Sequence, residues 1–574
     1  MTHTTEPAIP APETLSGAEA FIRVLLDEGI DTIFGYPGGN VIAIYDALYH
    51  YTDRLHHILT RHEQGAVHAA QGYARATGKT GIVLATSGPG ATNLVTGLAD
   101  AQLDSTPIVC ITGQVAEQVL GSDGFQETDI IGISMPVTKW NFQVTKAKDI
   151  APALSKALYI AHTGRPGPVL IDFTANAQKE MCSYLYKKCN FIRSYIPTPH
   201  ISKASIAEAA DLINRAEKPL VLVGQGVQLS HAEPELREFI EKGNLPAGCT
   251  LMGLSSLPTG HPLYMGMLGM HGQMALNKKT NECDVLIAVG MRFSSRIIGA
   301  AAAYAPQAKV IHLEVDPSEI NRSIAADIPV LGNMKRTLPM LTEKLEAHSH
   351  REWIESFKTW QDFEYDKVIR KQMQPEAGSR ITMGEVVKAF GDIDRGEAIV
   401  VTDVGQHQMM AARYARMNHP RSFITSGGLG TMGFGLPAAI GAKVGCPDRE
   451  VVLFVGDGGI QMTIQEFGTI LQNRIPVKII LLNNSFLGMV RQWQELFYGK
   501  RYSCTELENP DFIRIAQAYG IACRRVTERK DLSAAMQELC DSQEAFFLEV
   551  DVEKEGMVFP MIPAGASIDQ ILYE

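Results

Sequence analysis

Apolar residues along this chain gather in short continuous runs separated by stretches of mixed character. Nine runs are rich in Val and Ile and stop at or beside Gly, Asp, Asn or Thr: TGIVLATSG, STPIVCITG, GPVLIDF, KPLVLVGQG, CDVLIAVG, AKVIHLEV, EAIVVTDVG, EVVLFVGDGG and PVKIILLNN. Runs without polar alternation are typical of strands buried on both faces, as in parallel sheets covered by helices. The pattern predicts an α/β protein built from several doubly wound units rather than one barrel.

The alternation of strands and helices breaks down in two places. Residues 176–206 lose the rhythm and contain Pro197 and Pro199. Residues 346–380 are charged and aromatic without a strand, which predicts a surface helix and a connector, here called the linker helix region. The breaks predict three doubly wound domains with mainly parallel central sheets, over 15–190, 200–345 and 381–574. The Thr- and Pro-rich residues 1–14 are expected to form a flexible arm.

Composition limits the partners and the compartment. The 574 residues are 45% hydrophobic and 20% charged, with a formal net charge of −11. This acidic balance argues against a nucleic-acid partner, whose binding surface would be basic. The nine cysteines include no CxxC pair, which favours free thiols in a reducing compartment over disulfides or zinc. Without a signal-peptide pattern or an apolar run of about 18 residues, a cytoplasmic protein without a membrane partner is expected.

Two of the predicted strands end in residues with metal-binding chemistry. EVVLFVGDGG places Asp457 among three glycines, and PVKIILLNN places Asn484 at the end of the next run. A carboxylate, an amide oxygen and a backbone carbonyl form a hard-oxygen ligand set that suits Mg²⁺. The glycines let backbone N–H groups approach a diphosphate. Each half alone could be an ordinary turn, but the two together favour a metal and diphosphate site.

The pairing of GDG with NN resembles the motif of thiamin-diphosphate-dependent enzymes, and the resemblance covers nearly the whole chain. GYPGGNVIAIYDAL, RHEQGAVHAAQGYARATGK and ATSGPGATNLVTGLADA are similar to the pyrimidine-binding domain of acetohydroxyacid synthase (acetolactate synthase) catalytic subunits. The resemblance implies pyrimidine-binding, FAD-binding-like and diphosphate-binding domains in chain order. It also implies that Glu63 of RHEQ bonds the aminopyrimidine ring and favours the tautomer that activates the thiazolium carbon. Taken alone, Glu63 could be a surface residue in the first turn of a helix.

The same resemblance implies two sets of ligands for the diphosphate cofactor and its metal. Thiamin diphosphate would contact Pro37, Glu63, Gly405, Gln406, His407, Gly430, Met432, Gly456, Gly458, Gly459, Leu487, Gly488 and Met489. Mg²⁺ would be bound by Asp457, Asn484 and the backbone carbonyl of Phe486. Phe486 departs from the Glu often found at that position, which matters little where only the carbonyl binds the metal. Core packing is the alternative role for Met432.

Further motifs favour acetolactate synthesis among the reactions of this superfamily. GFQETDIIGISMPVTKWN, GMLGMHG, GMRFSSR and VRQWQ supply Phe125, Gln126, Lys139, Met270, Arg292 and Trp493. The resemblance implies catalytic roles for Glu63, Gln126, Lys139, Arg292 and Trp493. The implied reaction decarboxylates pyruvate on thiamin diphosphate and transfers the hydroxyethyl unit to a second pyruvate or to 2-oxobutyrate, in branched-chain amino-acid biosynthesis. A guanidinium can hold the acceptor carboxylate and an indole can shape a wall for its alkyl group, although an ion pair and a core aromatic are the alternatives.

The middle segment resembles the FAD-binding domain of the same enzymes, where the flavin is not needed for net redox chemistry. FAD would contact Arg165, Gly224, Gly226, Thr250, Leu251, Met252, Met270, His271, Gly290, Arg292 and Glu314. The chain departs from the family pattern in several places: RFDDR reads RFSSR, Gln225 interrupts a glycine triplet, and Asn333 replaces Asp. An empty structural domain is the alternative to a flavin site.

The resemblance also implies partners. In the related enzymes the residue corresponding to Glu63 faces the diphosphate site of a second copy, so a homodimer or homotetramer is expected, with a small regulatory subunit as a further partner. The alternatives are a catabolic, FAD-free acetolactate synthase, another thiamin-diphosphate-dependent 2-oxo acid carboligase or decarboxylase, and a non-catalytic homologue. A glyoxylate carboligase is disfavoured by the presence of Glu63.

Overall fold

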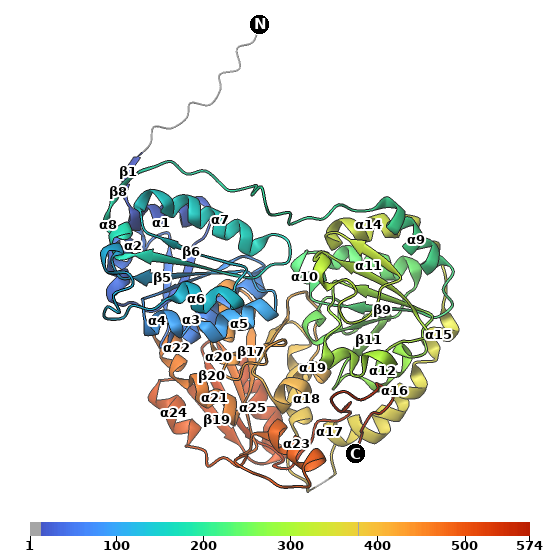
Figure 1. The fold of residues 1–574 in the computed structure, drawn as a ribbon. Coiled ribbons are helices and arrows are strands. Elements are labelled where there is room, and N and C mark those ends of the chain that lie inside the picture. The colour runs from blue at the N-terminus through green and yellow to red at the C-terminus, as the bar shows by residue number, and fades with distance from the viewer. Residues whose placement is uncertain (1–12, 377) are drawn as a thin grey trace. The chain divides into compact units, whose positions relative to one another are not determined.

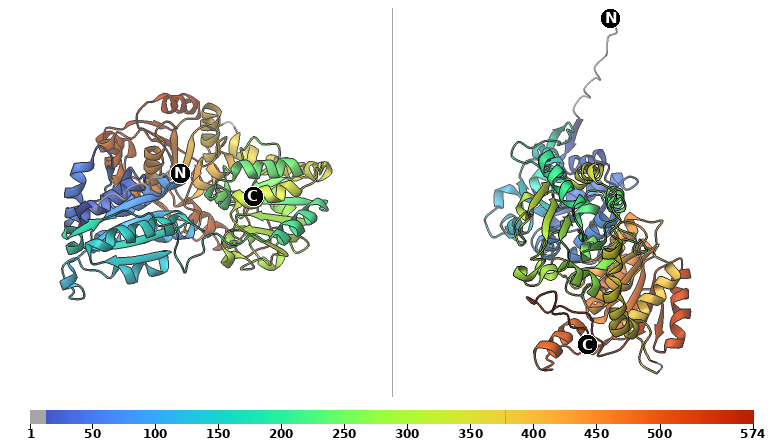
Figure 2. Two further views of the ribbon diagram at one scale, coloured as in Figure 1. Left: turned by 90° about the horizontal axis from the view of Figure 1, so that it is seen from above. Right: turned by 90° about the vertical axis from the view of Figure 1, so that its right-hand side faces the viewer.

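The computed structural model describes residues 13–376 and 378–574. They form two compact units (Figures 1 and 2). The first combines the residues up to Gln71 with Thr80–Tyr195, and the second combines Gly72–Lys79 with Ile196–Glu574. Within the described residues, the strands form three six-stranded sheets and one two-stranded pair. Every pairing within the three large sheets is parallel, which confirms the α/β class and the mainly parallel sheets expected from the sequence.

The first unit contains one large sheet, the first sheet, of order β3-β2-β4-β5-β7-β6. Its strands are β2 (Thr32–Gly35), β3 (His56–Leu59), β4 (Gly81–Ala85), β5 (Ile108–Gln114), β6 (Trp140–Val144) and β7 (Pro168–Thr174). Its helices are α1 (Gly17–Asp27), α2 (Ile42–Leu48), the start of α3 (Glu63–Thr77), α4 (Pro89–Thr92), α5 (Val95–Leu103), α6 (Ile130–Ser134), α7 (Ile150–His162) and α8 (Ala175–Lys179). Every residue of β4, β5 and β7 is buried, as their uninterrupted apolar runs predict.

The second unit begins with the central sheet, of order β11-β10-β9-β12-β13-β14. Its strands are β9 (Pro219–Val223), β10 (Ala247–Cys249), β11 (Tyr264–Met267), β12 (Val285–Val289), β13 (Lys309–Glu314) and β14 (Ile328–Leu331). Its helices are α9 (Lys203–Asn214), α10 (Gly226–Leu229), α11 (Glu233–Gly243), α12 (Met274–Thr280), α13 (Ser295–Ile298) and α14 (Met334–Lys344). Counted along the chain, the strand order is 3-2-1-4-5-6, the arrangement of dinucleotide-binding sheets.

The third sheet, also in the second unit, has the order β16-β15-β17-β18-β20-β19. Its strands are β15 (Ile399–Thr402), β16 (Phe423–Ile424), β17 (Val451–Gly456), β18 (Lys478–Asn483), β19 (Ala522–Val526) and β20 (Phe546–Asp551). Its helices are α18 (Met383–Asp394), α19 (Gln406–Tyr414), α20 (Gly435–Gly445), α21 (Asp457–Thr463), α22 (Phe467–Asn473), α23 (Gly488–Phe497), α24 (Phe512–Ala518) and α25 (Arg529–Asp541). Counted along the chain, its strand order is 2-1-3-4-6-5, and the first sheet has the same order.

The two segments without strand rhythm fold differently from each other. Residues 176–206 include β8 (Met181–Tyr184), which pairs antiparallel with β1 (Glu13–Ser16). The linker helix region forms α15 (Arg351–Glu355), α16 (Lys358–Glu364), a π-helical turn (Tyr365–Ile369) and α17 (Arg370–Met373). It is only partly a surface element, because Trp353 and Phe357 are buried in the core of the central sheet. The Trp353 indole donates to the Pro219 carbonyl at 2.8 Å, so this helix covers the start of β9.

Three other features bear on the sequence predictions. The flexible arm predicted for 1–14 lies outside the described residues up to residue 12, but Glu13 and Thr14 belong to β1 and pair with β8, so the prediction is wrong for these two. All nine cysteines are free. Over the described part of the chain, no helix is both long and apolar enough to cross a membrane.

Candidate active site

Asp457 and Asn484 lie beside each other at the carboxyl edge of the third sheet. Asp457 directly follows β17 and opens α21, while Asn484 directly follows β18. The two strands are paired, with Gly456 opposite Leu482. Both side chains are buried. The parallel register therefore brings together the carboxylate and the amide that the sequence places far apart.

Burial dominates the electrostatics of Asp457. Removal of the carboxyl group from water raises its pKa to about 6, although several hydrogen bonds act in the opposite direction. The strongest comes from Asn509, whose Nδ2 donates to Oδ2 of Asp457 at 2.6 Å and to Oδ1 of Asn483 at 3.1 Å. Gln461 in turn donates to Asn509 Oδ1 at 3.1 Å. A divalent cation at this carboxylate would stabilise its charged form.

The backbone after Asn484 is fixed by a short antiparallel contact. Phe486 pairs with Glu506, and the flanking bonds run from Leu487 N to Thr505 O and from Leu507 N to Ser485 O, each 2.8 Å long. In such a pair the N–H and C=O of the central residue point away from the partner segment. The Phe486 N–H accordingly donates to Oδ1 of Asn484 at 3.3 Å. Its carbonyl faces the same side, so the three predicted metal ligands share one region.

This ligand set is poor in charged groups. Over the described residues there is no cluster of three or more His, Cys, Asp or Glu side chains able to hold a metal ion. The predicted set has one carboxylate and two neutral oxygens, with water and phosphate completing the shell. Mg²⁺ suits such a set, because it keeps several waters and is commonly bound together with substrate phosphates.

The first turn of α19 adds a buried histidine to this edge. His407 follows Gly405 and Gln406 after β15, and its Nε2 atom is buried without a hydrogen-bond partner. Burial lowers its pKa to about 3, which outweighs a hydrogen bond with the Asp403 backbone, so the ring is neutral at pH 7. Gln406 accepts from Asn484 Nδ2 at 3.4 Å and donates to the Gly556 carbonyl at 2.8 Å.

Two glycines allow the loops of this site to approach closely. A Cβ on Gly459 would lie 2.5 Å from Oδ1 of Asp403, and one on Gly488 would lie 2.2 Å from Oε1 of Gln406. Asp403 accepts backbone bonds from Val404, Gly433 and Gly435, and so fixes the loop that carries the predicted Gly430 and Met432. The remaining predicted contacts lie on the same loops: Gly458 on α21, and Leu487, Gly488 and Met489 at the start of α23. The unpartnered His407 nitrogen and these closely approaching loops fit a bound diphosphate and its metal.

Glu63 occupies a comparable edge in the first unit. It opens α3 after β3, and its Oε2 accepts from Asn93 Nδ2 at 2.9 Å. A Cβ on Gly90 would lie 3.2 Å from Oε1 of the same carboxylate. Pro37 follows β2 and is exposed. The Asn93 amide holds one carboxylate oxygen, which leaves the other for a ligand.

The other predicted residues of the first unit are more scattered. Gln126 has a left-handed backbone, with φ of 60°, and lies against Gly88, while the neighbouring Phe125 side chain is 88% exposed. The Lys139 ammonium donates to the carbonyls of Ile160 and Thr163 at the carboxyl end of α7, a favourable place for a cation. Arg165 precedes β7, donates to Ser105 at 2.9 Å and so lies at the opposite edge of the sheet from Glu63.

Two residues predicted from the sequence, Met270 and Trp493 on α23, lie together beside Arg296. The Arg296 guanidinium lies over the Trp493 ring, 5.7 Å from its centroid, and donates to the Met270 sulfur at 3.1 Å. Met270 and Trp493 also belong to one apolar cluster. The guanidinium over Trp493 belongs to Arg296, the second arginine of RFSSR, and the predicted role of the first, Arg292, stays a prediction.

The chain also matches known proteins along most of its length. Three family models of thiamine pyrophosphate enzymes match the chain. The model of the "Thiamine pyrophosphate enzyme, N-terminal TPP binding domain" matches residues 15–133, that of the central domain matches 206–341, and that of the C-terminal TPP binding domain matches 403–550. The "Acetolactate synthase isozyme 2 large subunit" of Escherichia coli (strain K12) is 43% identical over 559 residues, covering 97% of this chain and 99% of that protein. The chain belongs to the acetolactate synthase large-subunit family. The "Acetolactate synthase large subunit" of Parasynechococcus marenigrum is 44% identical, covering 98% of this chain and 91% of that protein.

Within this acetolactate synthase family member, the predicted flavin residues of the second unit lie at the carboxyl edge of the central sheet. Gly224 follows β9 and Gly290 follows β12, the two strands on either side of the topological switch point. The two turns touch, since a Cβ on Gly224 would lie 2.3 Å from the Gly290 carbonyl. The same edge carries further predicted residues, on a strand end, on loops or in the first helical turn after a strand: Gly226, Thr250, Leu251, Met252, Met270, His271, Arg292 and Glu314. This arrangement fits a dinucleotide.

Two of these predicted flavin contacts have defined local partners. Glu314 ends β13, is buried, and accepts from the backbone N–H of Val315 at 2.8 Å. His271 is buried, and burial lowers its pKa to about 4, so it is neutral at pH 7. Its Nδ1 lies 3.3 Å from the Pro560 carbonyl, which identifies that nitrogen as the one carrying hydrogen, because a carbonyl only accepts.

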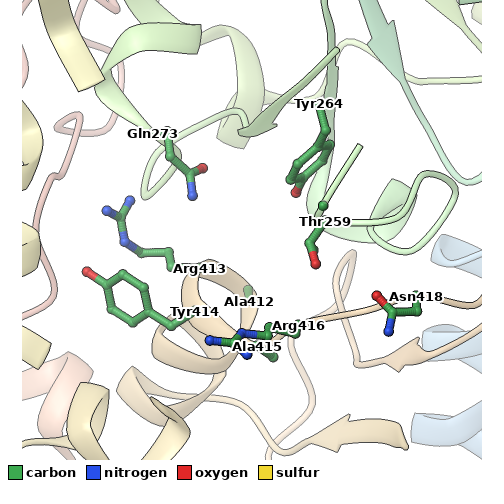
Figure 3. A pocket seen from close by; sticks show the side chains of 10 residues that line it. Thr259, Tyr264, Gln273, Ala412, Arg413, Tyr414, Ala415, Arg416 and Asn418 are labelled. Carbon is green, nitrogen blue, oxygen red and sulfur yellow. The ribbon is translucent and has the colours of Figure 1, made fainter. Parts of the chain in front are cut away.

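A separate cavity of about 350 Å³ lies at the far end of α19 (Figure 3). Its lining includes Thr259, Tyr264 and Gln273 from the central domain and Arg413 and Arg416 from the end of α19 and the residues that follow it. These side chains surround the space in the close-up view. None of them is among the predicted site residues.

Four residues of these sites were not predicted from the sequence: Asn509, Asp403, Asn93 and Arg296. Asp403 and Arg296 stand within quoted motifs, TDVGQHQM and GMRFSSR, so a signal existed for them. Asn509 and Asn93 have no local signal, because only the fold brings them to Asp457 and Glu63.

Proposed function

We propose that this chain is the catalytic subunit of an acetolactate synthase that makes 2-acetolactate from two pyruvates, or 2-aceto-2-hydroxybutyrate from pyruvate and 2-oxobutyrate. The observation that carries the proposal is the buried Asp457–Asn484–His407 edge of the third sheet. The names of its relatives and the matched TPP binding domains support it.

We propose that Asp457, Asn484 and the Phe486 carbonyl hold Mg²⁺, which ties the diphosphate to the third sheet. Thiamin diphosphate, when bound, supplies the carbanion that attacks pyruvate and the electron sink that lets carbon dioxide leave. His407 is neutral and its ring bond to Asp403 leaves Nε2 with a lone pair, so contact with a phosphate oxygen there requires uptake of a proton. The carboxylate of Glu63 bonds the pyrimidine ring and holds or receives its proton.

The proposed acceptor site is the group around Trp493. The Arg296 guanidinium binds the carboxylate of the second 2-oxo acid, and Trp493 with Met270 walls its alkyl group. One methylene in such a wall contributes about 1–3 kcal/mol, enough to favour 2-oxobutyrate over pyruvate. The roles proposed earlier for Gln126, Lys139 and Arg292 remain proposals, with Lys139 held by helix carbonyls in this conformation.

Further proposals concern cofactor and partners. FAD occupies the carboxyl edge of the central sheet, supported by its dinucleotide-type strand order. The chain assembles at least as a homodimer, in which Glu63 of one copy would serve the diphosphate residues of a second, as the family resemblance implies. It works with a small regulatory subunit, as the words "large subunit" in the names of its relatives suggest.

The test is acetolactate formation from pyruvate by the purified chain, with thiamin diphosphate, Mg²⁺ and FAD added together and omitted singly. Product that requires thiamin diphosphate and Mg²⁺ is expected. Absence of product with all three present, and with a regulatory subunit added, would overturn the proposal. A flavin absorption spectrum in the purified protein separates the proposed FAD-binding enzyme from a catabolic, FAD-free one.

A further inference from the structure

The second unit contains a buried ion pair that the proposed reaction does not use. Arg413, near the end of α19, pairs through Nη2 with Oε1 of Glu364 at the end of α16. The two side chains are 0% and 2% exposed. A buried ion pair stabilises a fold only where further hydrogen bonds satisfy its groups; here Nη1 of Arg413 and Oε2 of Glu364 have such bonds, whereas Nε of Arg413 has none. The other bonds of the pair therefore indicate what it holds.

The bonds of the pair to backbone groups go to one loop and the helix that follows it, while the guanidinium also lies over the Tyr414 ring, 5.3 Å from its centroid. Nη1 of Arg413 donates to the carbonyls of His271 and Gly272, at 2.8 and 3.1 Å. Oε2 of Glu364 accepts from the backbone N–H of Met274, the first residue of α12, at 2.6 Å. The ion pair thus forms hydrogen bonds on both sides of the junction between the loop 268–273 and α12.

The loop 268–273 forms part of the acceptor site. Met270 N donates to the Arg296 carbonyl at 2.8 Å, and the Arg296 side chain donates back to the Met270 sulfur. Arg296 in turn covers Trp493. A displacement of the His271 and Gly272 carbonyls would therefore move the adjacent Met270 and, with it, the Arg296 that is bonded to it.

The opposite end of α19 belongs to the diphosphate site. Gln406 and His407 form its first turn, seven and six residues before Arg413. Between them, Met410 and Ala411 are buried in the apolar core that the central and third sheets share. The helix is therefore anchored along its length, and its carboxyl end provides a fixed point for the loop.

The loop has other restraints as well: Asn277 exchanges two hydrogen bonds with Gly269, and the Ile562 N–H donates to the Met270 carbonyl at 2.8 Å. Gln273 borders the 350 Å³ cavity, in which Tyr264 and Thr259 are its neighbours across open space (Figure 3). Its own side chain is bonded back to Met267 N at 2.6 Å rather than to the opposite wall. The bonds from Arg413 and Glu364 are those that tie the carboxyl end of the loop, from His271 to Met274, to the ends of α19 and α16.

We infer that Arg413, held in place by Glu364, is a positioning residue for the acceptor site: it fixes the loop 268–273 on the end of α19 and thereby sets Met270 and Arg296 relative to the cofactor. The inference rests on the proposed function for its consequence, the choice of acceptor. The loop's restraint by the ion pair does not depend on any activity.

The experiment compares the full-length chain with four variants, all with thiamin diphosphate, Mg²⁺ and FAD present. Arg413→Lys keeps the charge but loses the fork that spans two carbonyls and a carboxylate. Glu364→Gln keeps the shape and removes the pairing charge. The double variant R413M/E364M replaces the pair by apolar side chains, a change that proteins often tolerate in folding. Arg416→Gln is the matched control, since Arg416 is exposed and lies three residues further along the chain.

Two readouts are taken on each variant. Hydrogen exchange of peptides covering 267–274 is expected to rise about tenfold or more in the three test variants, while exchange over β17 stays unchanged. With pyruvate and 2-oxobutyrate in competition, the ratio of the two products is expected to shift at least about threefold, because small displacements of binding groups change rates by up to about 100-fold. The Arg416→Gln variant is expected to match the parent in both.

Unchanged exchange over 267–274 in the double variant would overturn the inference, and so would faster exchange with an unchanged product ratio. If the parent protein forms no acetolactate, the proposed function is refuted, but this result does not bear on the restraint of the loop. Faster exchange confined to 267–274 would then still support the restraint of the loop by the ion pair, and unchanged exchange would still overturn it.

Discussion

Asn509 offers a sharp test of the metal site, because it holds the proposed ligand Asp457 without touching the metal. Its Nδ2 lies 2.6 Å from Oδ2 of Asp457, and that hydrogen bond lowers the pKa of a carboxyl group that burial raises. Asn509→Ala removes the bond and leaves the neighbouring Asn483 oxygen without this donor. The variant is expected to bind Mg²⁺ more weakly while keeping its fold.

The magnitude follows from the type of bond. A hydrogen bond to a charged group contributes about 1.5–3 kcal/mol, which corresponds to about 10- to 150-fold in a binding constant. Loss of a hydrogen-bond partner of a metal ligand typically costs about 10- to 100-fold in affinity, so the two values agree. The loss of unfolding free energy should be smaller than the loss of binding, because Asn509 is only half buried.

The assay is calorimetric titration of Mg²⁺ into the protein with saturating thiamin diphosphate. A second measurement follows the dependence of enzyme activity on the Mg²⁺ concentration. Asn473→Ala is the matched control, because Asn473 donates to the Thr469 carbonyl at 2.9 Å in the same domain, away from the site. It should leave the Mg²⁺ constant unchanged. An Asn509→Ala variant that binds Mg²⁺ within about twofold of the parent would refute the assignment of Asp457 as a ligand oriented by Asn509.

Three further predictions concern other parts of the chain. Glu63→Gln should lower kcat by about 100- to 10,000-fold, the usual contribution of a positioned acid–base group. Its melting temperature should stay near that of the parent, because the hydrogen bond from Asn93 can persist. Retained activity in a kinetic assay would contradict the role of Glu63. Arg296→Gln should raise the KM for 2-oxobutyrate about tenfold or more, and Arg292→Gln should raise it less; the reverse order in initial-rate measurements would return the acceptor role to Arg292. Burial raises the pKa of the Asp172 carboxyl group to about 6. The folded state therefore keeps a proton that the unfolded state loses near pH 4. As a result, the free energy of unfolding falls by up to about 3 kcal/mol as the pH rises from 4 to 6. Asp172→Asn should remove this loss, with a melting temperature equal to that of the parent at low pH and higher at pH 7.5; parallel pH profiles would contradict the assignment.

The buried strands could be predicted from the sequence because their burial is complete. All nine apolar runs became strands, and β4, β5, β7, β9, β12, β15 and β17 are buried at every position. Edge strands such as β3, β6 and β19 are half exposed and mixed in composition, so their sequences show no uninterrupted apolar run. β20 was missed for another reason. Buried Glu549 interrupts its apolar run and is stabilised there by Arg525 and Asn483, partners that only the fold supplies.

The site was predictable to the extent that strand ends determine it. Asp457 and Asn484 each follow an apolar run, and parallel pairing brings such ends to one edge. The choice between Arg292 and Arg296 depends on longer-range contacts. The chain leaves β12 at Val289 and turns, and the Met270 N–H bonded to the Arg296 carbonyl decides which guanidinium reaches Trp493. No spacing within RFSSR contains that information.

The first and third sheets show how one topology can serve two different chemistries. Both have the strand order 2-1-3-4-6-5, so their switch points fall at equivalent edges, between β2 and β4 and between β15 and β17. The residue directly after the third strand is Thr86 in one sheet and Asp457 in the other. Thr86 accepts the Asn40 N–H at 3.2 Å and closes its edge with a neutral bond, whereas Asp457 presents a buried carboxylate. The acid of the first edge is instead Glu63, which follows β3 and has an amide donor, Asn93, on one oxygen. In the proposed function, the carboxylate of the third sheet would bind the cation of a diphosphate and that of the first sheet would exchange a proton with a ring, so one strand order carries two different roles.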